Sequence, residues 1–151
     1  VVFVALVRPS FAYQTTGVMN VLVWFRNDLR LRDNPALNSA IKSGLPVLAC
    51  YVHDEITTKR KLGGASKWFL DKALRSLQTD LSKKHIPLLL IRGDAREEMP
   101  RLCSEHKISH MFWNRRYDPV DMAVDKDIET KLKESGLLVD THASFLLFEP
   151  W

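Results

Sequence analysis

The chain has 151 residues, of which 46% are hydrophobic and 26% charged, with a formal net charge of +4. This length fits one domain with a sizeable core, and the composition excludes a disordered or collagen-like chain. The mildly basic balance permits an anionic partner but does not demand one. The two cysteines, Cys50 and Cys103, form no CxxC pair, which predicts buried free thiols in a reducing compartment such as the cytoplasm.

Residues 1–18 precede the first recognisable element. Their run VVFVALV is apolar but too short to span a bilayer, and neither a basic stretch nor a convincing cleavage site accompanies it. We interpret residues 1–18 as upstream read-through or an expression remnant outside the fold, with a signal peptide as the alternative. Residues 19–151 are then expected to form one α/β domain, with no association with a membrane.

The first predicted elements are a strand, a short helix and a second strand. Residues 20–25 (NVLVWF) favour a strand because they are rich in β-branched and aromatic side chains. Asn34 and Pro35 are typical of a helix start, and Gly44 is typical of the residue just past a helix end. The continuous apolar run 46–52 predicts a strand that is buried on both faces.

A long helix is expected over residues 65–84. Its apolar residues recur at the spacing of one helical face: Trp68, Phe69, Ala73, Leu74, Leu77 and Leu81. We therefore expect this whole face, including both aromatic residues, to pack in the core. Pro87 follows the helix, and residues 88–91 predict a third strand.

Asp94 and Glu97 resemble a capping box at the start of a third helix. Pro100 is expected to kink that helix or to delay its start. The remaining predicted elements are a strand over 110–114, a helix over 118–135, a strand over 137–140 and a final apolar run over 145–148.

This alternation of strands and helices predicts an α/β fold: a doubly wound, Rossmann-like, five-stranded parallel sheet of order 3-2-1-4-5, with helices on both faces. In such sheets a ligand binds beyond the carboxyl ends of the strands, where the strand order reverses. That rule places a candidate crevice between the first and fourth strands. The polar residues expected around it are Arg26, Asn27, Asp28, His53, Asp54, Glu55 and residues 114–118.

Sequence motifs of several other functional classes are missing. The six glycines form neither a GxGxxG motif nor a Walker A loop, which argues against a nicotinamide dehydrogenase and a P-loop enzyme. Neither HExxH nor GxSxG occurs, and no metal site is predicted. The sequence therefore contains no self-sufficient catalytic constellation.

One long segment carries a specific resemblance. Residues 23–37, VWFRNDLRLRDNPAL, closely resemble the opening strand, loop and helix of the photolyase/cryptochrome family. Three further stretches are similar to that family in the same order: 64–70 (GASKWFL), 110–119 (HMFWNRRYDP) and 145–151 (FLLFEPW). The resemblance extends over residues 20–151, and its second and last stretches look most like class I cyclobutane pyrimidine dimer photolyases.

The resemblance implies a parent protein in two parts. The amino-terminal α/β domain would hold an antenna pigment, and a carboxy-terminal helical domain, absent from this chain, would bind FAD and damaged DNA. The expected function is therefore that of the antenna domain of a light-dependent deoxyribodipyrimidine photo-lyase, a carbon–carbon lyase. No catalytic residue is expected in this chain, and no partner protein is implied. The alternatives are a cryptochrome photoreceptor or a stand-alone nucleotide- or pigment-binding module.

The resemblance also bears on the identity of the pigment. Folate-binding members tend to carry an Asn-Glu pair where this sequence has Val120 and Asp121, which weakens the case for a folate. Deazaflavin-binding members place an acidic residue after the second strand, and Asp54 occupies that position, so a deazaflavin or flavin is favoured. An empty site is the alternative. The candidate pigment-binding residues are Arg26, Asn27, Asp54, Asn114 and Asp121.

Overall fold

The computed structural model describes residues 19–56, 61–144, 146 and 148–149. The interpretation of residues 1–18 as an extension lies outside these residues, as do positions 145 and 147 of the expected final apolar run. Strands and helices alternate along the described chain: β1 (Asn20–Phe25), α1 (Pro35–Lys42), β2 (Val47–His53), α2 (Gly64–Ser82), β3 (Leu88–Arg92), α3 (Ala95–Glu105), β4 (Ile108–Asn114), α4 (Pro119–Glu134) and β5 (Leu138–His142).

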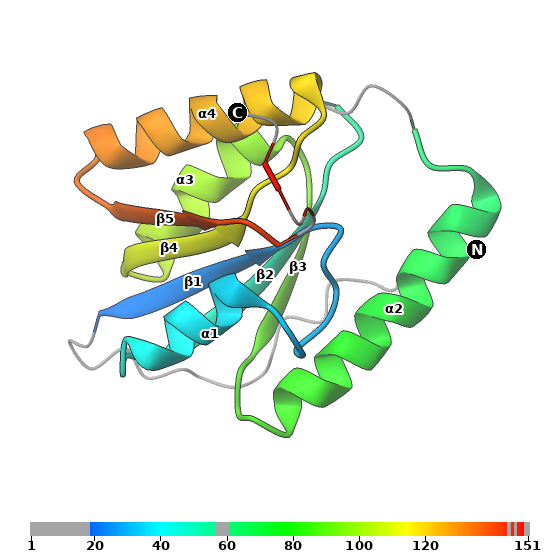
Figure 1. The fold of residues 1–151 in the computed structure, drawn as a ribbon, viewed down its shortest axis with the longest axis horizontal. Helices are drawn as coiled ribbons and strands as arrows, with labels where there is room; N and C mark the ends of the chain where they lie inside the picture. Colours follow the sequence, from blue (N-terminus) through cyan, green and yellow to red (C-terminus); the bar gives the residue numbers. More distant parts are fainter. Residues whose placement is uncertain (1–18, 57–60, 145, 147, 150–151) are drawn as a thin grey trace.

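The five strands form one parallel sheet of order β3-β2-β1-β4-β5, which confirms the predicted topology (Figure 1). Helices α3 and α4 cover one face of the sheet, and α1 and α2 lie on the other. The strand order reverses between β1 and β4, so the switch point lies where sequence reasoning placed it.

Strand β1 is central, and all six of its residues are buried. Because side chains alternate along a strand, Leu22 and Trp24 enter the core layer under α3 and α4, whereas Val21, Val23 and Phe25 enter the layer under α1 and α2. The continuous apolar sequence of β1 is therefore explained by burial on both faces.

Side-chain caps begin three of the helices, and the predicted helix start at Asn34 is confirmed. Asn34 accepts the N–H of Leu37 at the start of α1, and Asp118 accepts the N–H of Val120 at the start of α4. Asp94 does the same for Arg96 in α3. The caps fix where each helix begins, and so fix the loops that follow β1, β3 and β4.

Pro100 lies inside α3, so the expectation of a delayed start is wrong: the helix runs from Ala95 to Glu105. Met99, Leu102 and Cys103 are buried against the sheet. We attribute the helix's continuation through the proline to this packing, because tertiary contacts rather than propensity supply most helical stability in proteins.

The expectation that Trp68 and Phe69 pack in the core is also wrong. Their side chains are 63% and 69% exposed, and the buried residues of α2 are Leu77 and Leu81, near its carboxyl end. The reason is length. A 19-residue helix is about 28 Å long, whereas the five-residue edge strand β3 spans only about 17 Å. The amino-terminal part of α2 therefore reaches beyond the sheet (Figure 1).

Candidate functional site

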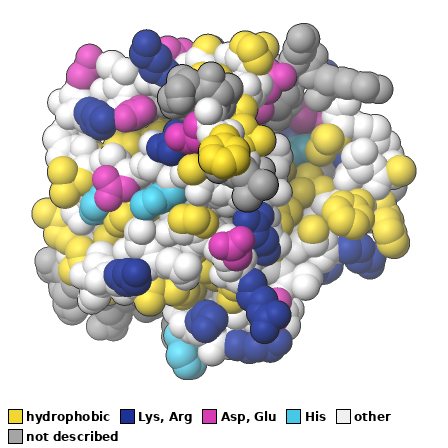
Figure 2. Space-filling view, in the orientation of Figure 1, with side chains coloured by type: hydrophobic (Ala, Val, Ile, Leu, Met, Phe, Trp, Pro, Cys, Tyr) yellow, Lys and Arg dark blue, Asp and Glu magenta, His cyan; other side chains and the backbone are white. Residues whose placement is uncertain are grey.

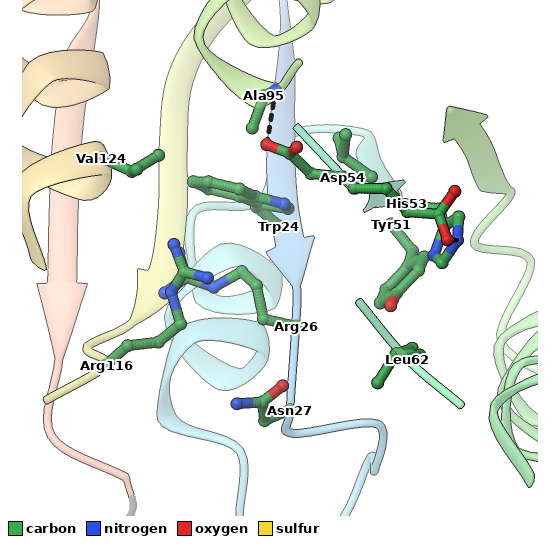
Figure 3. A pocket seen from close by; sticks show the side chains of 12 residues that line it. Trp24, Arg26, Asn27, Tyr51, His53, Asp54, Leu62, Ala95, Arg116 and Val124 are labelled. Carbon is green, nitrogen blue, oxygen red and sulfur yellow. Dashed lines mark hydrogen bonds and ion pairs between the residues drawn. The ribbon is translucent and has the colours of Figure 1, made fainter. Parts of the chain in front are cut away.

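A cavity of about 140 Å³ lies at the carboxyl ends of β1 and β2, beside the switch point (Figure 3). It is bounded by the end of β1, the end of β2, the first residue of α3 and the side of α4. Its lining residues are Trp24, Arg26, Asn27, Tyr51, Val52, His53, Asp54, Glu55, Leu62, Ala95, Arg116 and Val124.

Arg26 is the central charged group of this site and is only 6% exposed. Its Nη1 donates to Asp125 Oδ1 at 3.0 Å, and its Nη2 donates to the carbonyl oxygen of Asn114. Its guanidinium carbon lies 4.3 Å from the centre of the Trp24 ring, a cation–π contact. Burial lowers the pKa of Arg26 from 12.5 to about 10, which leaves the side chain charged at neutral pH.

Two buried N–H donors at the carboxyl end of β1 lack an acceptor. Neither the indole Nε1 of Trp24 nor the Nε of Arg26 has a hydrogen-bond partner among the described residues. Both side chains line the cavity, and Figure 3 shows them one above the other. Trp24 is only 2% exposed and meets Trp113 edge to face, with ring centres 5.8 Å apart and planes at 77°. Buried donors without acceptors are rare in folded proteins, so the pair is a candidate contact for an acceptor-bearing ligand, although other described side chains such as Arg96 and His142 also hold an unpartnered nitrogen.

The positive charge of the site is largely compensated. Arg116 contacts Asp125 Oδ1 through Nη2 at 2.5 Å and Asp121 Oδ1 through Nη1 at 2.9 Å. Arg26 shares the same Asp125 carboxylate, so two cations face two anions. Because the two arginines are already neutralised by carboxylates, the site suits a ligand that is neutral or carries one negative charge better than it suits a polyphosphate.

Asp54, the predicted acidic residue after β2, lines the cavity but has its carboxylate engaged by backbone groups. Oδ1 accepts the N–H of Ile56 at 2.7 Å, and Oδ2 accepts the N–H of Ala95 at 3.0 Å. The second bond joins β2 to the amino end of α3 and is drawn in Figure 3. Asn27 is exposed and lies in the lining of the same cavity.

Asn114 and Asp121 do not line this cavity. Asn114 is fully buried; its Nδ2 donates to Asp28 at 2.5 Å and to Asn34 at 2.9 Å, and its Oδ1 accepts from the Ala36 backbone. Asp121 lies in the first turn of α4, paired with Arg116, and burial raises the pKa of its carboxyl group. The structure thus brings Arg26, Asn27 and Asp54 together in the lining of the cavity. Asn114 and Asp121 lie outside the lining and contact residues that belong to it.

Arg116, His53 and Glu55, which the sequence places around the crevice, also line the cavity, whereas Trp24 and Tyr51 were in neither predicted set. Trp24 could have been found from the period of a strand, because it lies two residues before Arg26 and therefore faces the same way. Tyr51 is half-buried, and burial raises its pKa to about 12. Its position on the rim depends on tertiary packing, for which the sequence carries no local signal.

Among residues 19–56, 61–144, 146 and 148–149, no three His, Cys, Asp or Glu side chains gather as a metal-binding group. Over the same residues, no helix combines the length and the apolar character needed to cross a membrane.

The cavity accommodates only part of a pigment. A cavity of about 150 Å³ accepts one benzene-sized ring, whereas pockets for drug-sized ligands measure about 300–1,000 Å³. The unpartnered groups of Trp24 and Arg26 are both N–H donors, and carbonyl oxygens and ring nitrogens are the acceptors complementary to them. The volume fits one ring and does not fit a complete flavin or folate in this arrangement of side chains.

Comparison with known sequences shows the relationship of this chain. The DNA photolyase family profile matches residues 21–151. The deoxyribodipyrimidine photo-lyase of Agrobacterium fabrum is 43% identical over 130 residues, which are 86% of this chain and 27% of that protein. Cryptochrome-1 of Arabidopsis thaliana is 33% identical over 132 residues, or 86% of this chain and 19% of that protein.

Comparison with solved structures indicates the same family. A bacterial class III photolyase from Agrobacterium tumefaciens superposes with a TM-score of 0.82 at 40% identity, covering 93% of this chain and 29% of that one. An archaeal photolyase from Sulfolobus tokodaii, described with two FAD molecules, gives a TM-score of 0.75 at 25% identity, covering 87% of this chain and 31% of that one.

The relatives do not single out class I, because a class III photolyase and cryptochromes stand among the similar proteins. The chain spans about a quarter of the length of the Agrobacterium photo-lyase and a fifth of the length of the plant cryptochrome. The switch-point crevice therefore lies in a chain that belongs to the DNA photolyase family and corresponds to its amino-terminal α/β domain.

Proposed function

We propose that this chain is the antenna domain of a light-driven deoxyribodipyrimidine photo-lyase, whose parent protein repairs cyclobutane pyrimidine dimers in DNA. The identity of 43% to a protein of that name supports this proposal. FAD and the damaged DNA would both be bound outside residues 1–151, in a helical domain. The similarity to a class III photolyase favours that class over class I for the parent.

The observation that carries the antenna role is the pair of unpartnered donors, Trp24 Nε1 and Arg26 Nε. An unsatisfied buried polar group costs about 1–3 kcal/mol, so a ligand that supplies acceptors recovers this free energy on binding. Flavins, deazaflavins and folates all present carbonyl oxygens and ring nitrogens. We propose that one ring of such a pigment enters the cavity and that the rest lies at its mouth, beside Asn27.

The other predicted site residues then act indirectly. Asp54 positions the amino end of α3, where Ala95 forms one wall. Asn114 orients Arg26 through its backbone carbonyl, and Asp121 orients Arg116 through their ion pair. Only Arg26 and Asn27 of the predicted set, together with Trp24, would contact the pigment.

Pigment binding is tested by titrating residues 1–151 with FMN, a deazaflavin and methenyltetrahydrofolate, and following the fluorescence anisotropy of each pigment. Trp24→Phe removes the donor but keeps an aromatic ring, so we expect an affinity about tenfold lower for the pigment that binds, equivalent to about 1.4 kcal/mol. Trp113→Phe is the matched control, since Trp113 is the other member of the buried pair and does not line this cavity. An absence of binding by all three pigments contradicts the antenna role.

The light-driven reaction is tested on the full-length parent protein, by counting dimers in irradiated DNA after blue light and after darkness. Light-dependent loss of dimers is the expected result. Flavin photoreduction without any loss of dimers would instead support the cryptochrome alternative. The identity of 33% to Cryptochrome-1 is the observation that favours this alternative.

A further inference from the structure

A second, larger cavity lies beside the first one, on the other side of Arg116. Its volume is about 400 Å³, and it lies between α4 and the carboxyl ends of β4 and β5. Trp113 and Thr141 line it from the sheet, and Met122 and Ala123 line it from the helix. Among the described residues, Arg116 is the only one that lines both cavities.

The two cavities have complementary properties. The larger one falls within the range of about 300–1,000 Å³ that is usual for drug-sized ligands, but no described side chain in its lining holds an unpartnered buried polar atom. The smaller one contains the free donors Trp24 Nε1 and Arg26 Nε, but it has room for only about one ring. The recognition groups and the space for a fused ring system therefore lie on two sides of one partition.

This partition is thin. Trp24, in the lining of the smaller cavity, meets Trp113, in the lining of the larger one, with ring centres 5.8 Å apart. Trp24, Trp113 and Val124 are at most 2% exposed and belong to the core beneath α3 and α4, so close packing fixes them. Of the side chains in the partition, Arg116 is therefore the one that can leave without opening the core.

Arg116 is held in the partition by charge. Its Nη1 contacts Asp121 at 2.9 Å, and its Nη2 contacts Asp125 at 2.5 Å. Figure 3 shows its side chain reaching toward Trp24, and its guanidinium carbon lies 5.7 Å from the centre of that ring. Departure of Arg116 strands neither carboxylate, because Asp125 keeps Arg26 at 3.0 Å and the side chain of Asp121 is 25% exposed to solvent. An ion pair that is partly open to water is weak, so this side chain can be displaced.

The surface beside the larger cavity favours an uncharged ring system. In the upper part of Figure 2, where α4 lies, Lys and Arg side chains are interspersed with Asp and Glu. No field of a single sign therefore draws a phosphate group toward this side. The lining itself offers the indole of Trp113 and the thioether of Met122, and a thioether makes favourable contacts with aromatic rings.

We propose that Arg116 is a gate between the two cavities, and that its displacement lets a pigment with fused rings extend from the smaller cavity into the larger one. This inference rests on the proposed function, because it concerns the same pigment. Binding then has two steps. One ring first enters the smaller cavity and meets Trp24 and Arg26, and the other rings afterwards occupy the space that Arg116 vacates. The structure shows the closed state of this gate.

The test compares two uncharged ligands that share a dioxopyrimidine edge, uracil with one ring and lumichrome with three. Stopped-flow quenching of tryptophan fluorescence follows the association of lumichrome with residues 1–151, and calorimetry gives the affinity for uracil. Arg116→Ala removes the gate. Arg115→Ala is the matched control, because Arg115 lines only the larger cavity. Asp121→Asn releases one ion pair of Arg116 without changing either lining, and it tests the gate even if Arg116→Ala fails to fold.

For the wild type we expect the rate of lumichrome association to level off at high ligand concentration, because opening of the gate limits it. Arg116→Ala should speed this association at least about tenfold, since a conformational change that precedes binding lowers the association rate. Asp121→Asn should raise the limiting rate about threefold, and Arg115→Ala should leave it unchanged. The affinity for uracil should stay within about twofold in all variants, because a single ring needs only the smaller cavity.

Equal rates of lumichrome association in the wild type, Arg116→Ala and Asp121→Asn overturn the gate and leave the proposed function standing. Weaker binding of lumichrome by Arg116→Ala also overturns it, since Arg116 is then a contact of the pigment. Equal acceleration by Arg115→Ala does the same, because the effect is then not specific to the partition. If neither ligand binds to the wild type or to any variant, the proposed pigment site and the gate both fail.

Discussion

Asn114 joins three segments of the chain from a fully buried position at the end of β4. Its amide contacts Asp28 in the loop after β1, Asn34 at the cap of α1, and the backbone of Ala36. Asn34 in turn accepts the N–H of Leu37. The loop after β1, which borders the cavity, is therefore held in place by a network of buried hydrogen bonds. The loss of one side chain leaves its partners with unsatisfied polar groups.

Asn114→Ala should lower the free energy of unfolding by about 2–4 kcal/mol, because it leaves the buried oxygens of Asp28 and Asn34 short of a donor. Urea unfolding monitored by circular dichroism measures the change. Asn27→Ala, at an exposed position in the lining, is the control and should change stability by less than about 0.5 kcal/mol. Equal effects of the two substitutions would show that the network contributes little.

Tyr51, in the lining of the cavity, should make the stability of the fold depend on pH in the alkaline range. Burial raises the pKa of its phenol from 10.0 to about 12, so the folded state keeps a proton that the unfolded state releases. The stabilisation is complete below pH 10 and is lost as the pH rises through 12. We expect the wild type to lose up to about 2–3 kcal/mol more stability than Tyr51→Phe over this interval. Urea unfolding of both proteins below pH 10 and near pH 12 measures this difference in stability, and a phenol of Tyr51 that ionises with its ordinary pKa of 10.0 contradicts the prediction.

At the scale of elements, Glu55 joins β2, β3 and α2. Hydrogen bonding from Lys67 is the main cause that lowers the pKa of Glu55 to about 2. The stabilisation is therefore present above the ordinary carboxyl pKa of 4.5 and is lost as the pH falls toward 2. Near neutral pH the pairing holds the amino-terminal part of α2 beside the cavity.

Glu55→Gln should release this part of the helix. We expect the backbone amides of residues 64–70 to exchange with deuterium roughly three- to tenfold faster in the variant, while those of the central strands stay unchanged. Asp80→Asn is the control, because Asp80 pairs with Lys83 at the exposed, opposite end of α2. Unaltered exchange in Glu55→Gln would mean that apolar contacts, rather than the ion pairs, hold the helix start.

The same helix shows where sequence reasoning succeeds and where it fails. Its existence follows from the apolar period, and β1 and β2 follow from continuous apolar runs, because these signals are local. Burial is not local. Trp68 shares a helical face with Leu77, yet only the second meets the sheet, since contact depends on the length of the neighbouring strand. Asn114 likewise has the residue type of a ligand group, and only the tertiary structure shows that its amide is already bonded.

For the whole molecule, the strand order and the position of the crevice followed from the alternation of elements, because right-handed crossovers leave few compact arrangements. The division of labour with a second domain remains a proposal. It predicts that residues 1–151 alone cause no light-dependent loss of pyrimidine dimers, even with pigment bound, since the proposed electron donor, FAD, lies outside them. The full-length protein in the same assay is the control, and measurable repair by the shorter chain would refute the division.

The edge-to-face contact of Trp24 and Trp113 has an optical consequence. Two indoles held 5.8 Å apart at 77° in a rigid core couple their electronic transitions, so the folded chain should show a strong near-ultraviolet circular dichroism signal that vanishes when the packing is lost. Trp24 also borders the cavity, so a chromophore seated there would accept its excitation and quench its emission. The domain thus carries an intrinsic reporter of both its packing and its occupancy, and neither reading requires an added label.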